Sequence, residues 1–331
     1  MTARPRLGFL GAGWIGRKRL EAVIASDVAT AVAIADPSPA RRDEAARVAP
    51  GACLCEHLGQ LLELPLDGVV IATPSAQHVD QALAVLDRGL AVFCQKPLAR
   101  TAGEARAVVD AARRGDHLLG VDLSYRHTDA MQRIRDVVAG GGLGRVFATN
   151  LVFHNAYGPD QPWFYDRAAA GGGCLIDLGI HLVDLALWLL GWPAVEDARA
   201  QLHAGGRRLG TPATVCEDFV SAQLALAGGV TAQLSCSWRL PAGRDCVIEA
   251  SWYGTGGGVA MRNVGGSFYD FVAERFDGTR TEVLATPPDD WGGRALVAWA
   301  RQLAAGRGFD PDAERLVDLH RALDAIYRGG R

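Results

Sequence analysis

Residues 6–16 read RLGFLGAGWIG, an apolar run that leads directly into three closely spaced glycines. The run is typical of a buried strand, and the residues that follow show helical periodicity as far as Ala25. At such a strand-to-helix turn, glycines permit a tight bend and close approach of a pyrophosphate to the backbone, while the helix N-terminus supplies amide donors. The pattern predicts a bound dinucleotide. Its contacts are expected at Gly11, Gly13, Trp14, Ile15 and Gly16.

An acidic residue, Asp36, ends the next predicted strand, about 20 residues after the last of these glycines, where a carboxylate accepts hydrogen bonds from the adenosine ribose. Its charge would repel a ribose 2′-phosphate, and Pro37-Ser38 beyond it offers no basic side chain. Arg41 and Arg42 lie in the next helix and are long enough to reach back, so NADP stays open. The sequence favours NAD over NADP.

Short apolar runs alternate with amphipathic stretches from residue 6 to about residue 122. This rhythm predicts a doubly wound parallel sheet of the Rossmann type. Its strands are expected at residues 7–10, 31–35, 68–72, 91–93 and 118–121.

The pattern changes at Val146, where the apolar runs become longer, alternate with polar residues and are joined by turns such as Ala227-Gly228-Gly229. These features predict a largely antiparallel open sheet with few helices. We therefore expect two domains. Residues 1–122 would bind the dinucleotide, and residues 123–331 would form an α+β domain for substrate binding and oligomerisation, with its final helix able to pack back on the first domain.

The composition is that of a globular protein, with 331 residues, 49% of them hydrophobic, and a formal net charge of -3. This balance offers no field of one sign for nucleic acid or an anionic membrane, so a small-molecule partner is expected. The seven cysteines lack the paired spacings of a zinc site or a secreted disulfide framework. With no recognisable signal or membrane span, we expect a soluble cytoplasmic protein without a metal.

Two further segments carry reactive side chains. Lys96, in Cys94-Gln95-Lys96-Pro97, stands just beyond a predicted strand, at the edge where open α/β sheets bind ligands, although an isolated lysine there is more often only solvated. Asp177, His181 and Asp184 are spaced to share one face of a helix. A carboxylate one turn from a histidine can fix the ring tautomer, and a histidine can accept a hydroxyl proton near neutral pH, but such a histidine is as often structural.

The order of these segments, together with Ala72-Thr73-Pro74-Ser75-Ala76-Gln77-His78, resembles the glucose-fructose oxidoreductase and inositol dehydrogenase family (Gfo/Idh/MocA) over essentially the whole chain. The resemblance implies an NAD(P)-dependent oxidoreductase acting on a hydroxyl or ketone of a sugar, inositol or similar compound. It implies catalytic roles for Lys96, often with a cis peptide at its proline, and for Asp177 and His181. Further cofactor contacts are expected at Thr73, Pro74, Ser75, His78, Gln95 and Lys96. The family usually has Glu in place of Gln95, so the electrostatic setting of the lysine is altered here.

In this interpretation His181 takes the hydroxyl proton, Lys96 stabilises charge on the same oxygen, and Asp177 binds a neighbouring hydroxyl and orients the histidine. Aromatic rings beside polar groups suit a sugar or cyclitol, although they are also typical of simple packing. Substrate contacts are expected at Lys96, Tyr125, Arg126, His154, Asn155, Trp163, Asp177 and His181.

Two alternatives remain at this stage. An NAD-dependent glycosidase would act by transient oxidation, and release of free sugar without net NADH would identify it. A non-catalytic dinucleotide sensor is disfavoured because Lys96, Asp177 and His181 are all present. Because a single long helix cannot cover the second sheet, we also expect a homodimer or homotetramer through sheet faces.

Overall fold

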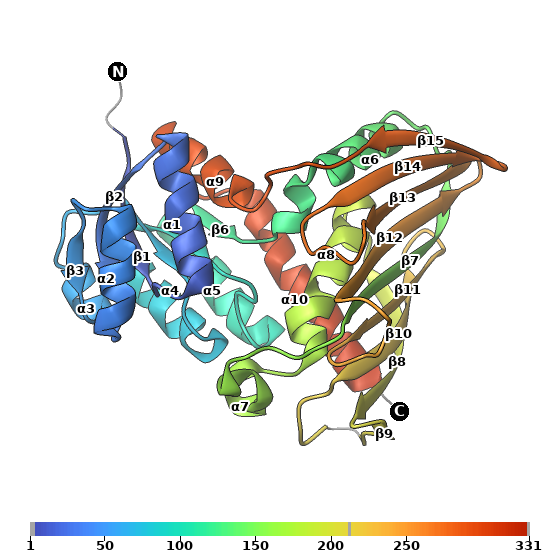
Figure 1. Ribbon diagram of the computed structural model, residues 1–331, viewed down its shortest axis with the longest axis horizontal. Helices are drawn as coiled ribbons and strands as arrows, with labels where there is room; N and C mark the ends of the chain where they lie inside the picture. Colours follow the sequence, from blue (N-terminus) through green and yellow to red (C-terminus); the bar gives the residue numbers. More distant parts are fainter. Residues whose placement is uncertain (1–3, 211–212, 330–331) are drawn as a thin grey trace. The chain divides into compact units, whose positions relative to one another are not determined.

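The computed structural model describes residues 4–210 and 213–329, which divide into two compact units (Figure 1). Unit 1 comprises the residues up to Ser124 together with Gly292–Val317, and unit 2 comprises Tyr125–Trp291 together with the residues from Asp318. The sequence placed the boundary two residues earlier and assigned 292–317 to the second domain. That segment carries a helix whose apolar side chains belong to the core of unit 1.

Six described strands form the sheet of unit 1, all of them parallel, in the order β3-β2-β1-β4-β5-β6. They are β1 (Arg6–Leu10), β2 (Thr30–Ala35), β3 (Cys53–Cys55), β4 (Gly68–Ile71), β5 (Ala91–Cys94) and β6 (Leu119–Val121). The predicted doubly wound sheet is confirmed, with its strand order reversing between β1 and β4. The sequence missed β3 because this strand has three residues, two of them exposed, and so forms no buried apolar run.

The helices of unit 1 are α1 (Trp14–Ser26), α2 (Pro39–Val48), α3 (Leu58–Leu61), α4 (His78–Asp87), α5 (Ala102–Arg114) and α9 (Arg294–Ala304). Ser38 and Thr101 cap α2 and α5, since their hydroxyls accept hydrogen bonds from amides of the first turn. Leu296 and Trp299 of α9 are buried in the same core as Phe93, whose ring centroid lies 5.7 Å from that of Trp299. This burial is why α9 belongs to unit 1.

Nine described strands form the sheet of unit 2, in the order β15-β14-β13-β12-β7-β11-β10-β8-β9. Among them β7 and β11 pair in parallel and the other neighbours are antiparallel, which confirms the predicted sheet type. The strands are β7 (Val146–Asn155), β8 (Val195–Ala204), β9 (Arg207–Arg208), β10 (Phe219–Leu226), β11 (Val230–Ser237), β12 (Cys246–Gly254), β13 (Gly257–Asn263), β14 (Phe271–Asp277) and β15 (Arg280–Ala285).

Helices lie along one face of this sheet (Figure 1). They are α6 (Asp129–Ala139), α8 (Ile180–Leu189) and the part of α10 (Glu314–Gly329) that belongs to unit 2, while the short helix α7 (Arg167–Ala170) packs against the turn Pro162–Tyr165. Among the described residues, the run Arg167–Leu189 is long and apolar enough to cross a membrane by length and composition, but 89% of its most apolar window is buried inside the protein. The core helix of a globular domain passes the same test.

Candidate active site

The glycine turn after β1 has the geometry that the dinucleotide fingerprint requires. Gly11 has φ +93°, and a Cβ there would lie 2.4 Å from the carbonyl oxygen of Ala72, so only glycine fits. A Cβ at Gly13 would meet no described atom within 4 Å, which leaves open space in front of the backbone. The first turn of α1 begins at Trp14, whose side chain is 57% exposed. The turn therefore fits a pyrophosphate at the start of α1.

Asp36 is 2% exposed and organises the same turn. Its Oδ2 accepts a hydrogen bond from the amide of Ala12 at 2.8 Å, and its Oδ1 accepts one from the amide of Ser38 at 2.9 Å. Each carboxylate oxygen keeps a second lone pair, so a ribose hydroxyl can still be bound. Arg41 places a guanidinium nitrogen 4.0 Å from Oδ2, and Arg42 donates to the backbone carbonyl of Asp36 at 2.6 Å. Positive charge therefore lies beside the carboxylate.

His78 joins the turns that follow β4 and β5. Its side chain is 1% exposed, and its ring nitrogens lie 2.7 Å from the carbonyl oxygens of Pro97 and Thr73. Burial lowers the pKa of His78 below its usual value. The Lys96-Pro97 peptide is cis, and Lys96 itself is partly exposed. The imidazole thus holds the turn that carries Lys96 against the turn expected to contact the cofactor.

Gln95 is part of a buried polar cluster that the sequence did not reveal. Its amide nitrogen donates to Oδ2 of Asp122 at 2.5 Å, and Arg19 of α1 donates to the same oxygen. Asp122 is 1% exposed, and its Oδ1 has no hydrogen-bond partner among the described residues. The register between β5 and β6 pairs Cys94 with Val121 and so brings the two residues that follow together. The buried carboxylate beside the Lys96 turn is thus that of Asp122, which directly follows the neighbouring strand β6.

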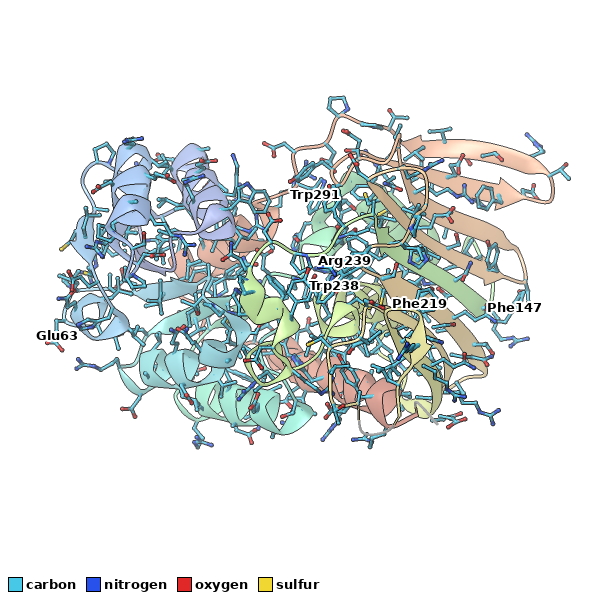
Figure 2. All side chains as sticks on the ribbon, turned by 60° about the horizontal axis from the view of Figure 1, so that its bottom comes forward. Glu63, Phe147, Phe219, Trp238, Arg239 and Trp291 are labelled. Atoms are coloured by element: carbon cyan, nitrogen blue, oxygen red, sulfur yellow. The ribbon has the colours of Figure 1, made fainter. Side chains whose placement is uncertain are left out.

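In unit 2, Asp177 lies in a π-helical turn, η4 (Leu175–Gly179), that leads directly into α8. The indole nitrogen of Trp238 donates to Oδ2 of Asp177 at 3.0 Å (Figure 2 shows Trp238 next to Arg239). Asp177 is partly exposed while the rest of η4 is buried. Such π-helical turns occur frequently at functional sites because they re-aim one side chain of a helix.

His181, in the first turn of α8, is 7% exposed and is enclosed by aromatic rings. The ring centroid of Tyr125 lies 4.8 Å from that of His181, and the centroid of Phe153 lies 6.4 Å from it. Tyr125 is itself packed against Phe271 and Trp291, at 5.8 Å and 5.1 Å between centroids. Burial raises the pKa of Tyr125, so its hydroxyl stays protonated. Tyr125 thus packs directly against the imidazole of His181.

Arg126 and Asp184 pair with each other. The Arg126 Nε donates to Oδ2 of Asp184 at 2.7 Å, and the guanidinium lies 5.8 Å and 5.3 Å from the rings of Trp188 and Trp192. Burial raises the pKa of Asp184, while Arg126 opposes that shift. The structure therefore gives Arg126 a structural partner within unit 2, and its contact with substrate stays a prediction.

His154 and Asn155 are adjacent in β7 and so point to opposite faces of the sheet. Asn155 has the same parity as Phe153, which lies beside His181, and its Oδ1 is buried without a hydrogen-bond partner among the described residues. His154 points to the other face, where its Nδ1 lies 2.7 Å from the hydroxyl of Ser237. The structure does not bring His154 together with Asp177 and His181.

Trp163 lies in the short helical turn Pro162–Tyr165 and is partly exposed. Its ring stacks on Phe164 at 3.8 Å between centroids, and Phe164 packs edge-on against Trp238 at 6.3 Å. Trp163 is therefore connected through Phe164 to the residue that binds Asp177. Trp238 was not among the residues predicted to form the site, although a tryptophan at the end of an apolar strand was the available signal.

Two family models match this chain. Residues 6–123 match the model of the oxidoreductase family with an NAD-binding Rossmann fold, and residues 131–260 match the GFO/IDH/MocA C-terminal domain. The chain belongs to the Gfo/Idh/MocA oxidoreductase family. The resemblance seen in the sequence is thereby confirmed, and so is the assignment of the protein as an oxidoreductase.

Two curated relatives and one solved structure show how far the similarity extends. The rhizopine catabolism protein MocA of Rhizobium meliloti is 32% identical over 77% of this chain and 77% of its own length. An inositol 2-dehydrogenase of Rhizobium meliloti is 31% identical over 78% of this chain and 76% of its own. The structure of GenD2 from gentamicin A biosynthesis, in complex with NAD, has a TM-score of 0.84 and 27% identity, and it covers 100% of this chain and 95% of that one.

No group of three or more His, Cys, Asp or Glu side chains in the described part of the chain is arranged to hold a metal ion.

Proposed function

We propose that this protein transfers a hydride between NAD and a secondary hydroxyl or ketone of a neutral sugar, cyclitol or similar polyol. The observation that carries the proposal is the arrangement in unit 2, where Asp177 and His181 stand on consecutive helical turns, Trp238 binds the carboxylate and the ring of Tyr125 packs against the imidazole. Aromatic rings fit the apolar faces of a sugar ring, and the polar groups fit its hydroxylated edge. The names of the curated relatives support the same class of substrate.

Each side chain has a definite task in this reaction. His181 takes the proton of the reacting hydroxyl, and in the reverse direction it returns that proton to the ketone oxygen. Asp177, held by Trp238, binds the neighbouring hydroxyl and orients the substrate. Lys96 stabilises the negative charge that develops on the reacting oxygen. A nicotinamide dinucleotide, when bound, supplies the hydride chemistry.

The residues of unit 1 that fit the dinucleotide are the glycine turn, the turn after β4 and Asp36. We propose NAD as the preferred form because the buried carboxylate of Asp36 would face a 2′-phosphate. The guanidinium of Arg41, 4.0 Å from that carboxylate, offsets part of this repulsion. We therefore expect a moderate preference for NAD, which is measured as the ratio of kcat/KM with NAD to kcat/KM with NADP.

A substrate screen tests the proposed function. Purified protein is incubated with NAD or NADP and with inositols, neutral aldoses, glycosides, sugar acids and nucleotide sugars, and the absorbance of the reduced cofactor is followed. Turnover of a neutral polyol with NAD is the expected result. Release of free sugar from a glycoside without net NADH would replace the dehydrogenase by the glycosidase mechanism. Binding of NAD without turnover of any of these compounds would contradict the proposal.

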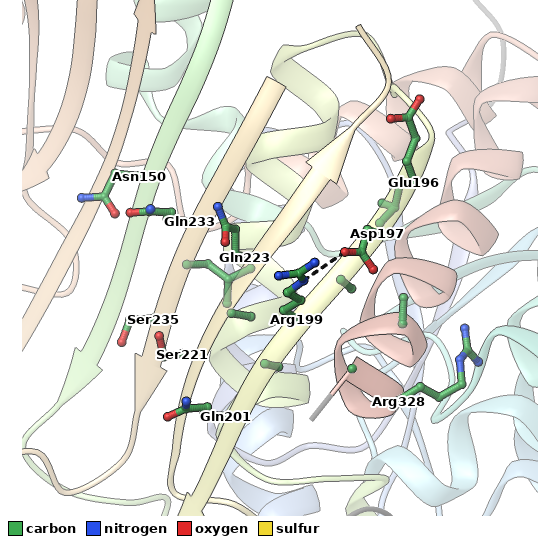
Figure 3. Close-up of a pocket in the computed structure, with 17 residues that line it drawn as sticks. Asn150, Glu196, Asp197, Arg199, Gln201, Ser221, Gln223, Gln233, Ser235 and Arg328 are labelled. Carbon is green, nitrogen blue, oxygen red and sulfur yellow. Dashed lines mark hydrogen bonds and ion pairs between the residues drawn. The ribbon is translucent and has the colours of Figure 1, made fainter. Parts of the chain in front are cut away.

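We also propose a homo-oligomer formed through the sheet face of unit 2 that carries no helix in the described structure. Amides and hydroxyls line this face (Figure 3), among them Asn150, Gln201, Ser221, Gln223, Gln233 and Ser235. Because these groups both donate and accept hydrogen bonds, the patch can pair with its own copy across a two-fold axis. Light scattering of the wild type and of Gln233→Arg tests it: a dimer or tetramer that the arginine dissociates is expected, and a monomeric wild type contradicts it.

All seven cysteines are free thiols, and five of them are buried. The sulfur atoms of Cys174 and Cys236 lie 3.9 Å apart, which is too far for a disulfide. We propose on this ground that the protein works in a reducing compartment such as the cytoplasm.

A further inference from the structure

Glu217 lies between β9 and β10, is 0% exposed, and takes no part in the proposed chemistry. Its Oε1 accepts hydrogen bonds from the amide of Gly173 at 2.9 Å, from the amide of Leu175 at 3.1 Å and from the hydroxyl of Tyr327 at 2.9 Å. Its backbone carbonyl accepts a fourth bond, from the amide of Cys174 at 2.9 Å. One buried residue therefore binds three consecutive amides at the start of the segment that carries Asp177.

The glycines before η4 fit this arrangement closely. A Cβ on Gly173 would lie 1.9 Å from the backbone oxygen of Glu217, and a Cβ on Gly172 would lie 1.9 Å from the hydroxyl of Tyr327. The backbone of Glu217 thus excludes a side chain at Gly173, and a side chain at Gly172 would displace the hydroxyl of Tyr327. The absence of side chains at these glycines allows close approach of Glu217 and of the C-terminal helix α10.

The carboxyl of Glu217 is held by hydrogen bonds more than by charge. Its nearest cation is Arg167, whose Nη1 lies 3.6 Å from Oε2, and neither of these two atoms has a hydrogen-bond partner among the described residues. Burial raises the pKa of Glu217, and the hydrogen bonds and Arg167 oppose that shift. Loss of Oε1 would leave the amides of Gly173 and Leu175 buried and unpaired, which is more costly than loss of an exposed contact.

The link to the reactive side chains is short and runs through the backbone. Gly173, whose amide Glu217 binds, accepts a hydrogen bond from the amide of Asp177 on its carbonyl at 3.2 Å. His181 follows in the first turn of α8. A displacement at Gly173 is therefore passed directly to Asp177, and an error of about 1 Å in such a group can lower turnover by about 100-fold.

We propose that Glu217 is a positioning residue, which fixes the glycine turn and η4 so that Asp177 and His181 face the substrate, and that Tyr327 ties this anchor to α10. The part of this proposal that concerns turnover rests on the function proposed above. The hydrogen bonds by which Glu217 anchors the turn are tested without substrate.

Two substitutions at one position separate anchoring from charge. Glu217→Gln keeps a carbonyl acceptor at Oε1 and removes the negative charge, whereas Glu217→Ala removes both. Tyr327→Phe removes one donor and keeps the ring. Glu249→Ala is the matched control, because Glu249 is a partly exposed carboxylate of the same sheet that pairs with Arg262 away from this anchor.

Hydrogen exchange of the peptide spanning residues 171–177 gives the first measurement, on protein without substrate. We expect faster exchange in Glu217→Ala, by about 10-fold or more, with near wild-type exchange in Glu217→Gln and in Glu249→Ala. Equal exchange in the wild type and in Glu217→Ala would overturn the anchor. If circular dichroism shows that Glu217→Ala does not fold, Tyr327→Phe decides the same question through a smaller increase in exchange at the same peptide.

Kinetics give the second measurement, with the polyol found in the screen. Glu217→Ala is expected to lower kcat by about 10- to 100-fold, to leave the dissociation constant for NAD within about 2-fold, and to be rescued by Gln to within about 3-fold of the wild type. A Gln variant as impaired as the Ala variant would show that the charge matters and not the anchor. Absence of turnover in the wild type would refute the proposed function, while the exchange result would still decide the anchor.

Discussion

The indole nitrogen of Trp238 and Oδ2 of Asp177 lie 3.0 Å apart. Trp238 directly follows β11, and it binds the carboxylate that the sequence assigned to the site. Trp238 is 3% exposed and its ring touches Phe164, which stacks on Trp163. The bond restricts rotation of the Asp177 carboxylate. In the proposed function, this bond would also set the orientation in which the carboxylate binds a substrate hydroxyl.

Trp238→Phe is expected to lower kcat/KM by about 10-fold, because a hydrogen bond to a charged group is worth about 1.5–3 kcal/mol and its loss frees the Asp177 carboxylate to rotate. Trp252→Phe is the matched control. Trp252 is a fully buried tryptophan of the same sheet, and its indole nitrogen has no hydrogen-bond partner in the described structure. An equal loss of kcat/KM in both variants would show that packing, and not the bond to Asp177, explains the effect.

Gln95→Glu is expected to destabilise unit 1 by about 1–3 kcal/mol at neutral pH, because it places a second carboxylate against buried Asp122. Such a pair has one pKa raised above its value in the unfolded chain. Stability of the variant relative to the wild type is then greatest below the unfolded pKa and falls as pH rises through the raised folded pKa. Thermal unfolding between pH 4 and pH 8 measures this; a stability difference from the wild type that does not grow with pH would contradict it.

Gln95→Met serves as the control in this experiment. It removes the hydrogen bond to Asp122 without adding charge, and Arg19 still pairs with that carboxylate. Its stability difference from the wild type is expected to be independent of pH over the same range.

The sequence predicted those strands and helices in which apolar residues form a continuous run or repeat at a regular spacing. β1, β4 and β5 are short and fully apolar on their inner residues, so they were recognised. β8 and β15 carry no such signal because their residues are largely exposed, and their place in the sheet comes from pairing with a neighbour.

The same limit applies to the site. Asp177 and His181 could be found because their spacing lies within one segment. Trp238 and Glu217 contact the segment of Asp177 within unit 2, and Asp122 contacts Gln95 within unit 1. Each of them comes from another strand or loop, so a local pattern in the sequence does not reveal the contact. Likewise, the sequence could not tell which of His154 and Asn155 faces α8. Adjacent strand residues point to opposite faces of a sheet, and the sequence alone does not show which face the helix covers.

His181→Ala is expected to lower kcat by about 100-fold or more and to abolish the rise of kcat with pH that a general base produces. NAD affinity, measured by calorimetry, should be unchanged, since the dinucleotide turn belongs to unit 1. His154→Ala is the matched control: it removes a partly buried imidazole of the same unit that contacts Ser237 on the opposite sheet face. Near-normal kcat in His181→Ala at every pH, with an intact fold, would return His181 to a structural role.

Asp36→Asn is expected to narrow the preference for NAD over NADP by about 10-fold or more in kcat/KM, because the negative charge facing a 2′-phosphate is removed. The amide oxygen of Asn can still accept the hydrogen bond from Ala12, so the glycine turn keeps its geometry. Asp36→Ala removes that acceptor as well and leaves the buried amide of Ala12 unpaired, so it should weaken the binding of both cofactors in addition to changing their ratio. The comparison thus separates the charge of Asp36 from its structural hydrogen bond.

The guanidinium of Arg41, 4.0 Å away in the wild type, loses its anionic neighbour in both variants and becomes available to a 2′-phosphate. Kinetics with the two cofactors on three proteins decide the matter: a wild type that already prefers NADP, or an Asn variant with an unchanged ratio, would show that Asp36 does not set the choice.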